Sequence, residues 1–291
     1  MSRRRCEFAL SAPGWPKIES SMPIVPHEAC SEPPSDTVIC RFVDFRKFRD
    51  LFANEEFYFR RTDLFKEVDP NEALPPDDYI RRVRGLTKYD LHDELALNND
   101  QASNRQFSEM RYIQCWQIFE DETLDMWARY GGGVAVFSRF DLLRHALDSM
   151  LDEIQVGLVR YGNEGPSRYN LVNFLFMKRK HFDKERELRT VLTCCDPMGG
   201  NNRHFGLDGF PNREPLDNEN PLHEWVHEYK RRRIDLKALV TEVRLSPWAT
   251  KEEIEEVDTW FKAKRFTCPV SRSDLTSPHT PTLEEFRDRG Y

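Results

Sequence analysis

The sequence predicts a single α+β domain in which a mixed, largely antiparallel sheet is flanked by helices. Several short runs rich in β-branched and aromatic residues predict strands, and several longer runs place apolar residues at helical spacing. The two kinds of run do not alternate evenly, which disfavours a doubly wound parallel sheet. A chain of 291 residues, 39% of them hydrophobic and 32% charged, is long enough to bury a substantial core.

The first predicted strand is the β-branched run TVICRFV at 37–43. Asp44 can then cap a helix in which Phe45, Phe48 and Phe52 recur at helical spacing. The same mixture of signals continues along the chain. Further strands are predicted at 56–61, 111–119, 134–138, 154–162, 188–195, 236–247 and 268–275, and helices in parts of 66–111 and at 121–130, 140–151, 170–187 and 250–264.

Composition divides the chain into a domain and its flanking segments. Residues 1–36 are rich in Pro, Ser and Glu, which predicts a flexible leader. Residues 37–275 form the predicted domain, and residues 276–291 form a loose tail. Gly, Asn and Pro recur throughout 196–230, so we expect a loop-rich insertion there.

Charge and cysteine content limit the class of protein. The net charge of −7, from 43 basic and 50 acidic residues, disfavours general nucleic-acid binding. Seven cysteines without a C-x-x-C pair predict a reduced, cytoplasmic protein. No apolar run approaches the ~18 residues that cross a bilayer, and the start of the chain lacks the apolar core of a secretory signal. We therefore expect no membrane partner.

The run KRKHFDKERELR at 178–189 is the densest stretch of charge. A helix at 170–187 would place Lys178 and Glu185 beside an apolar stripe. Where a strand then begins, Glu187 and Arg189 share one face because side chains in a strand alternate. These four side chains are therefore expected to face either a functional site or a buried ion-pair network, while their neighbours face solvent.

Several segments in a fixed order resemble one family. They are CRFVDFRKFRDLFANEEFYFRRTDLF, CWQIFEDETLDMWARYGGGVAVFS, KRKHFDKERELR, LVTEVRLSPWATKEEIEEV and PVSRSDL. Together these segments resemble the uncharacterised family called domain of unknown function 2971, over about Thr37 to Leu275. That resemblance implies an architecture and a set of residues to inspect, and it implies no particular reaction.

The order of residue types along the strands adds a functional expectation. Arg41 on an early strand, Ser138 on a middle strand and Glu187 on a late strand are similar to the layout of ADP-ribosyltransferases. That similarity implies that the arginine holds NAD phosphates, the serine shapes the nicotinamide pocket, and the glutamate stabilises positive charge as the glycosidic bond opens. The serine motif here is FSRF, without the Ser-Thr-Ser often seen there. The predicted site is completed by Glu185 as a second carboxylate and by the cofactor-binding candidates Arg60, Tyr112, Trp116, Lys178 and Arg189.

A nucleotide- or NAD-directed enzyme is thus the favoured prediction, with a nucleotide or a protein as acceptor, and two alternatives stay open. HEWVH at 223–227 matches a zinc-binding pattern through His223 and His227. Pro221 just before it and the lack of a clear third ligand disfavour zinc. The second alternative is a non-catalytic interaction domain. Its site residues would pair with one another, and an apolar patch would be exposed elsewhere.

Overall fold

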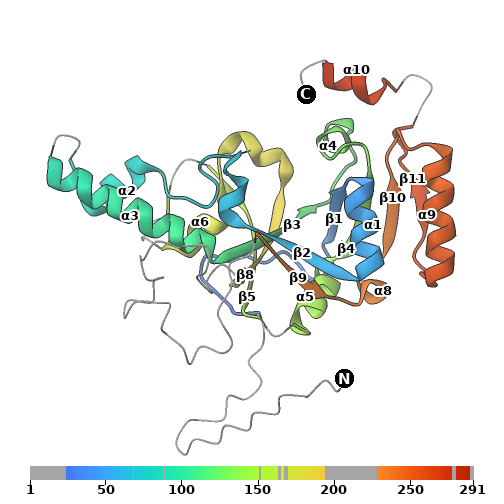
Figure 1. Ribbon diagram of the computed structural model, residues 1–291, viewed down its shortest axis with the longest axis horizontal. Helices are drawn as coiled ribbons and strands as arrows, with labels where there is room; N and C mark the ends of the chain where they lie inside the picture. Colours follow the sequence, from blue (N-terminus) through green and yellow to red (C-terminus); the bar gives the residue numbers. More distant parts are fainter. Residues whose placement is uncertain are drawn as a thin grey trace, which may run out of the picture.

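Among the residues that the structure describes, nine strands form the main sheet of this protein, drawn in Figure 1 as a computed structural model. The structure describes residues 24–67, 69–87, 90–150, 152–162, 165–166, 170–193, 228–276 and 280–288. The strands of the main sheet are β1 (Val38–Val43), β2 (Glu56–Arg61), β3 (Arg111–Ile118), β4 (Val134–Arg139), β5 (Ile154–Leu158), β8 (Glu187–Thr193), β9 (Tyr229–Arg233), β10 (Glu242–Leu245) and β11 (Val270–Arg272). A separate two-stranded sheet pairs β6 (Arg160–Tyr161) with β7 (Met177–Lys178).

Strand β3 is the branch point of the sheet. One of its edges pairs with β8, from Arg111 opposite Thr193 onward, and β8 in turn pairs with β5. Its other edge pairs first with β2 and then with β1, as in the pair Ile118 and Ile39. The sheet continues from β1 through β4 and β10 to β11, while β9 lies beyond β2. Only β10 and β11 pair in parallel within this sheet as the structure describes it, which confirms the predicted mixed, largely antiparallel α+β fold.

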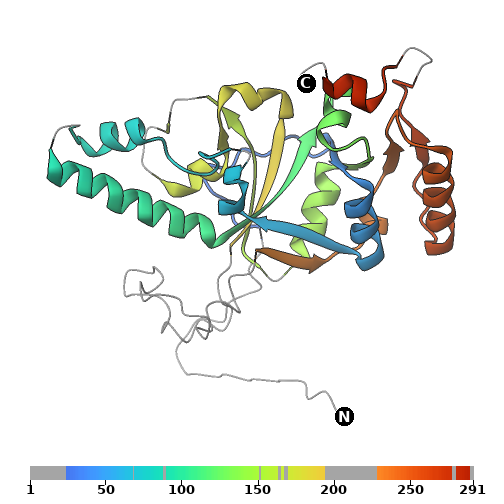
Figure 2. The same ribbon diagram turned by 45° about the horizontal axis from the view of Figure 1, so that its top comes forward.

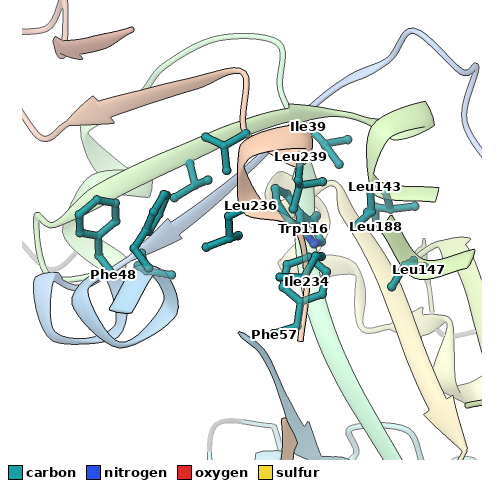
Figure 3. Packing of buried hydrophobic residues seen from close by; sticks show 14 of the residues in the cluster. Ile39, Phe48, Phe57, Trp116, Leu143, Leu147, Leu188, Ile234, Leu236 and Leu239 are labelled. Atoms are coloured by element: carbon teal, nitrogen blue, oxygen red, sulfur yellow. The ribbon is translucent and has the colours of Figure 1, made fainter. Parts of the chain in front are cut away.

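One face of the sheet, here called the core face, carries the largest apolar cluster (Figure 3). Trp116 of β3 and Leu188 of β8 point to it because side chains alternate along both strands. The helices α1 (Phe45–Asn54), α5 (Phe140–Asp148), α8 (Leu236–Leu239) and α9 (Lys251–Lys264) pack against this face. Three of them start at side-chain caps, Asp44, Asp235 and Thr250, which accept hydrogen bonds from the first turn.

The opposite face, here called the split face, carries two smaller apolar clusters. One contains Ile113 and Val191, and Cys115 packs against it. The other contains Cys40 and Phe42 of β1, with Trp127 of α4 (Leu124–Arg129). Charged side chains of β8 lie on the same face as these clusters, since Glu187, Arg189 and Val191 share the alternation of that strand. The split face is therefore where the predicted site residues can gather.

A helical hairpin extends from one end of the molecule, and α9 lies at the opposite end (Figures 1 and 2). The hairpin consists of α2 (Asp77–Arg84) and α3 (Leu91–Glu109), and ion pairs such as Arg81 with Glu94 join the two helices. The sequence predicted only partial helicity here. Among the described helices, none combines the length and the apolar character that a membrane span needs.

Both predicted flexible ends are partly ordered. Residues 24–36 pack on the sheet, where Ile24 is buried and forms a parallel bridge to Ile154 of β5. In the tail, α10 (Leu283–Asp288) buries Phe286 beside the ring of Trp248. Buried apolar side chains explain both differences from the prediction. The rest of the leader and most of the predicted insertion at 196–230 lie outside the described residues.

The predicted helix at 170–187 is wrong. The segment instead forms a short helix α6 (Leu171–Leu175), the extended pair of residues in β7, and a 3-10 helix η2 (Lys180–Glu185). Arg186 ends η2 with a φ of 41°, in the left-handed region. The predicted helical face is thereby broken, and the extended residue Lys178 can reach charged groups of β8.

Candidate functional site

Glu187 lies at the centre of a cluster of buried charges on the split face. Its carboxylate accepts from Arg189, with Nε 2.6 Å from Oε1 and Nη2 3.2 Å from Oε2. The ammonium of Lys178 lies 2.9 Å from Oε2, and Cys115 is a further neighbour of this carboxylate that favours its ionised form. Only 3% of Glu187 is exposed, so both carboxylate oxygens are used inside the protein.

A second carboxylate, Glu72, approaches the same cations from the segment between the 3-10 helix η1 (Thr62–Glu67) and α2. Its Oε1 lies 2.6 Å from Nη1 of Arg189, and its Oε2 lies 3.8 Å from the Lys178 ammonium. Nη1 of Arg189 also donates to the Leu175 carbonyl at 2.7 Å. Oε1 of Glu72 is close to Arg189 but poorly aligned for a hydrogen bond, so the contact is an ion pair.

The two buried carboxyls differ in their proton affinity. Burial raises the pKa of Glu187, but the charges of Arg189 and Lys178 outweigh it and lower that pKa to about 2. For Glu72, burial dominates and its pKa is raised despite the same two cations. Glu187 is therefore the permanently ionised carboxylate, and Glu72 takes up a proton more readily than an ordinary glutamate.

Glu185 connects this cluster to the protein surface. Its carboxylate accepts from the Lys178 ammonium at 2.7 Å and lies 3.3 Å from Nη1 of Arg129, which is partly exposed. The side chain of Glu185 is 13% exposed, more than that of Glu187. We call Glu72, Lys178, Glu185, Glu187 and Arg189 the ion-pair cluster, with Glu185 at its rim.

Tyrosine side chains complete the surroundings of the ion-pair cluster. The backbone N–H of Glu187 donates to the Tyr161 hydroxyl at 2.8 Å. Gln117 lies on the same face of β3 as Cys115, and its amide Nε2 is 3.4 Å from the Tyr130 hydroxyl. Burial raises the pKa of both tyrosines, so they stay protonated at neutral pH. Hydroxyl and amide groups thus line the approach to the charged residues.

Arg41 of β1 is the unusual cation in this region. Burial lowers the pKa of its guanidinium, and the largest opposing influences come from Cys115 and Tyr130. Within the described part of the chain, no carboxylate pairs with Arg41 and no acceptor takes a hydrogen bond from it. Its side chain is partly accessible. Arg41 lies opposite Val136, on the side of β1 that Ile39 and Val43 also take, and it supplies unused hydrogen-bond donors there.

The structure brings together some of the predicted site residues and separates others. Lys178, Glu185, Glu187 and Arg189 form a chain of direct contacts, whereas no ion pair or hydrogen bond within the described part of the chain joins Arg41 to them. The remaining candidates lie elsewhere: they are Arg60, Tyr112, Trp116 and Ser138.

Each of those four has its own structural partner. Ser138 is fully buried opposite Ile39 and donates to the Leu239 carbonyl at 2.7 Å. Tyr112 and Trp116 are buried in the core-face cluster. The guanidinium of Arg60 lies over the Phe65 ring, 5.1 Å from its centre. The structure thus leaves the predicted serine and stacking aromatics away from Glu187.

Sequence reasoning missed Glu72, Cys115, Arg129, Tyr130 and Tyr161 as neighbours of this site. Glu72 and Tyr161 lie in irregular or very short segments with no periodic signal. A signal did exist for Cys115, because Cys115 and Gln117 alternate with Trp116 in RYIQCWQIF and so face away from the core cluster.

Metal binding finds no support within the described ranges, where no three His, Cys, Asp or Glu side chains are arranged to hold an ion. The predicted zinc residues His223 and His227 lie outside those ranges. Arg41 is suited to hold the phosphates of a nucleotide, because its donors have no competing carboxylate among the described residues.

Comparisons with protein-family models, with curated proteins and with solved structures found no match to this chain. The resemblance to the domain of unknown function 2971 family therefore stays a prediction.

Proposed function

We propose that the protein is a nucleotide- or NAD-directed enzyme that holds the phosphates of its ligand on Arg41. The observation that carries this proposal is that Arg41, a largely buried cation on a central strand, has no acidic partner among the residues that the structure describes. Removing a charge from water without pairing it is costly. A bound phosphate would supply the missing partner, and the planar guanidinium matches its oxygens.

The carboxylates take different roles in this proposal. Both oxygens of Glu187 are engaged by Arg189 and Lys178, so Glu187 orients the two cations and is not free to bond a ribose hydroxyl. The oxygens of Glu185 are also paired, with Lys178 and Arg129, but Glu185 sits at the rim and is more exposed than Glu187. We therefore assign to Glu185 the carboxylate that stabilises positive charge as the nicotinamide–ribose bond opens.

Thermal unfolding in the presence of NAD tests the proposal. Ligand at about 100 times its dissociation constant adds roughly 2.7 kcal/mol to the stability of the folded state, which raises the midpoint by several degrees. Arg41→Gln should abolish this shift, and Glu185→Gln should weaken it. Arg46→Gln is the matched control, because Arg46 is an exposed arginine of α1 and lies in the same sequence region as Arg41.

A wild-type shift that survives in Arg41→Gln would contradict the assignment of Arg41. If NAD produces no shift and Arg41→Gln is strongly destabilised, Arg41 supports the fold and the enzyme proposal fails. The second candidate function, a protein-interaction domain, would then gain weight. It is favoured by the apolar side chains exposed on the α2–α3 hairpin, which are Val83, Leu91 and Leu95, with Leu91 77% exposed.

A further inference from the structure

The ribbon formed by β2 and β9 concentrates positive charge in an acidic protein. Its two strands carry six basic side chains and one acidic side chain, in a chain whose net charge is −7. Strand β9 lies at the end of the sheet order, and no other described strand pairs with its outer edge (Figure 1). The ribbon is therefore locally positive, although the protein as a whole carries a negative net charge.

The register of the ribbon sorts its side chains onto two faces. Phe57 and Phe59 are buried in the core-face cluster. Because side chains alternate, the opposite face carries the residues of three cross-strand pairs. These pairs are Glu56 with Arg233, Tyr58 with Arg231, and Arg60 with Tyr229.

Aromatic rings form a platform in the middle of this face. The rings of Tyr58 and Tyr229 are stacked, with centres 5.0 Å apart and planes inclined by 25°. The Arg231 guanidinium lies 5.9 Å and 5.5 Å from the two ring centres. Tyr229 is 42% exposed, unusually high for an aromatic side chain in this protein, so a flat group can stack on it.

Free and weakly held cations surround the platform. Neither Arg60 nor Arg233 has an acidic partner among the residues that the structure describes. Arg231 pairs with Asp50 at 3.0 Å and with Glu56 at 3.7 Å, on a partly exposed surface. Such exposed pairs stabilise a protein by about 0–1 kcal/mol, so a phosphate can replace a carboxylate there. The face thus combines an aromatic surface with guanidinium groups on either side of it.

We infer that this face of the β2–β9 ribbon binds single-stranded nucleic acid, with a base stacked on Tyr229 and phosphates held by Arg60 and Arg233. Unpaired bases offer a flat surface to an aromatic ring, and the backbone phosphates match guanidinium groups, without a need for a particular sequence. A duplex keeps its bases stacked inside the helix, so it offers no free base for Tyr229 to stack on. The inference is independent of a nucleotide site at Arg41.

Fluorescence anisotropy with a labelled oligothymidylate tests this inference. The wild-type protein should bind the oligonucleotide at low salt and lose affinity between about 50 and 200 mM salt. Tyr229→Ala should weaken binding at least about fivefold, since it removes one base-stacking contact. Arg233→Ala should weaken binding and reduce the slope of log affinity against log salt by about 0.7. Arg46→Ala, an exposed arginine outside the ribbon, is the matched control and should leave binding unchanged.

Three results would overturn the inference. They are the absence of binding at low salt, equal binding of a duplex of the same sequence, and unchanged affinity in Tyr229→Ala. Tyr229 is exposed, so circular dichroism should show that its variant keeps the fold, and a loss of affinity then reports on the ribbon surface.

Discussion

The core face and the split face of the sheet are built from the same strands and serve different purposes. On β8, Leu188 enters the large apolar cluster, while its neighbours Glu187 and Arg189 enter the ion-pair cluster. The core face buries apolar area, which is the main source of folding free energy. Buried ion pairs contribute little net stability compared with apolar packing, but removing one partner is strongly destabilising. The difference teaches that net stability alone does not account for the buried charges of the split face, and a ligand site is the role proposed above.

The largest expected effect is on the split face. Arg189→Met should lower the free energy of unfolding by about 3–5 kcal/mol, because it leaves the Glu187 carboxylate buried without its main partner. Urea unfolding measures this change. The double variant with Glu187→Leu should recover part of the loss, since the Glu187 carboxylate is then gone and only Glu72 still lacks its ion pair with Arg189. A loss below about 1 kcal/mol in the single variant would show that the pair is not coupled as the distances indicate.

A smaller effect concerns the pH dependence of stability. The folded-state pKa of Glu187 is about 2, below its ordinary value of 4.5, so its contribution is present above pH 4.5 and lost as pH falls toward 2. A decrease of about 2–3 kcal/mol over that window corresponds to such a shift. The raised pKa of Glu72 acts in the opposite sense, because the folded state then holds its proton more tightly.

The free energy of unfolding, measured between pH 2 and pH 6, therefore distinguishes a variant of the charged split face from a variant of the apolar core face. Glu187→Gln should flatten the acid side of the stability curve. Leu188→Ala, the adjacent residue on the core face, should lower stability by about 2–5 kcal/mol at every pH and leave the shape of the curve unchanged. If Glu187→Gln keeps the wild-type pH dependence, Glu187 is not the group whose protonation lowers the stability at acid pH.

The smallest expected effect is at Ser138. Ser138→Ala removes the hydrogen bond to the Leu239 carbonyl and should cost about 1 kcal/mol, read from chemical denaturation. The variant should keep any thermal shift that NAD produces, because Ser138 is separated from the ion-pair cluster by the sheet. A loss of that shift in a folded Ser138→Ala protein would restore the predicted role of this serine.

The sequence predicted β1, β3 and β4 well because their signal is local, but it missed β9 and predicted a strand from residue 236 where the structure has α8. TVICRFV, RYIQCWQIF and VAVFS each contain enough β-branched and aromatic residues to identify β1, β3 and β4. The shared face of Glu187 and Arg189 followed from the same alternation and is confirmed.

The failures came from contacts distant in sequence. The spacing of apolar residues made 170–187 look helical, but the structure extends Lys178 toward Glu187 and Glu72, which no local pattern encodes. Ser138 matched an expected order of residue types, yet its strand neighbours place it opposite Ile39, facing the core. Only the pairing of β1 with β4 decides that placement.

Strand β3 has partners on both edges. One partner, β1, precedes it in the sequence, and the other, β8, follows it after a long interval. Its amide hydrogens should therefore be among the slowest to exchange with solvent, since exposing them requires separating β1, β2 or β8. During synthesis, however, the edge that receives β8 stays open until residue 193 has emerged. An unpaired, largely apolar edge is a site for aggregation, so a nascent chain interrupted between β3 and β8 should depend on chaperones more than the finished protein does.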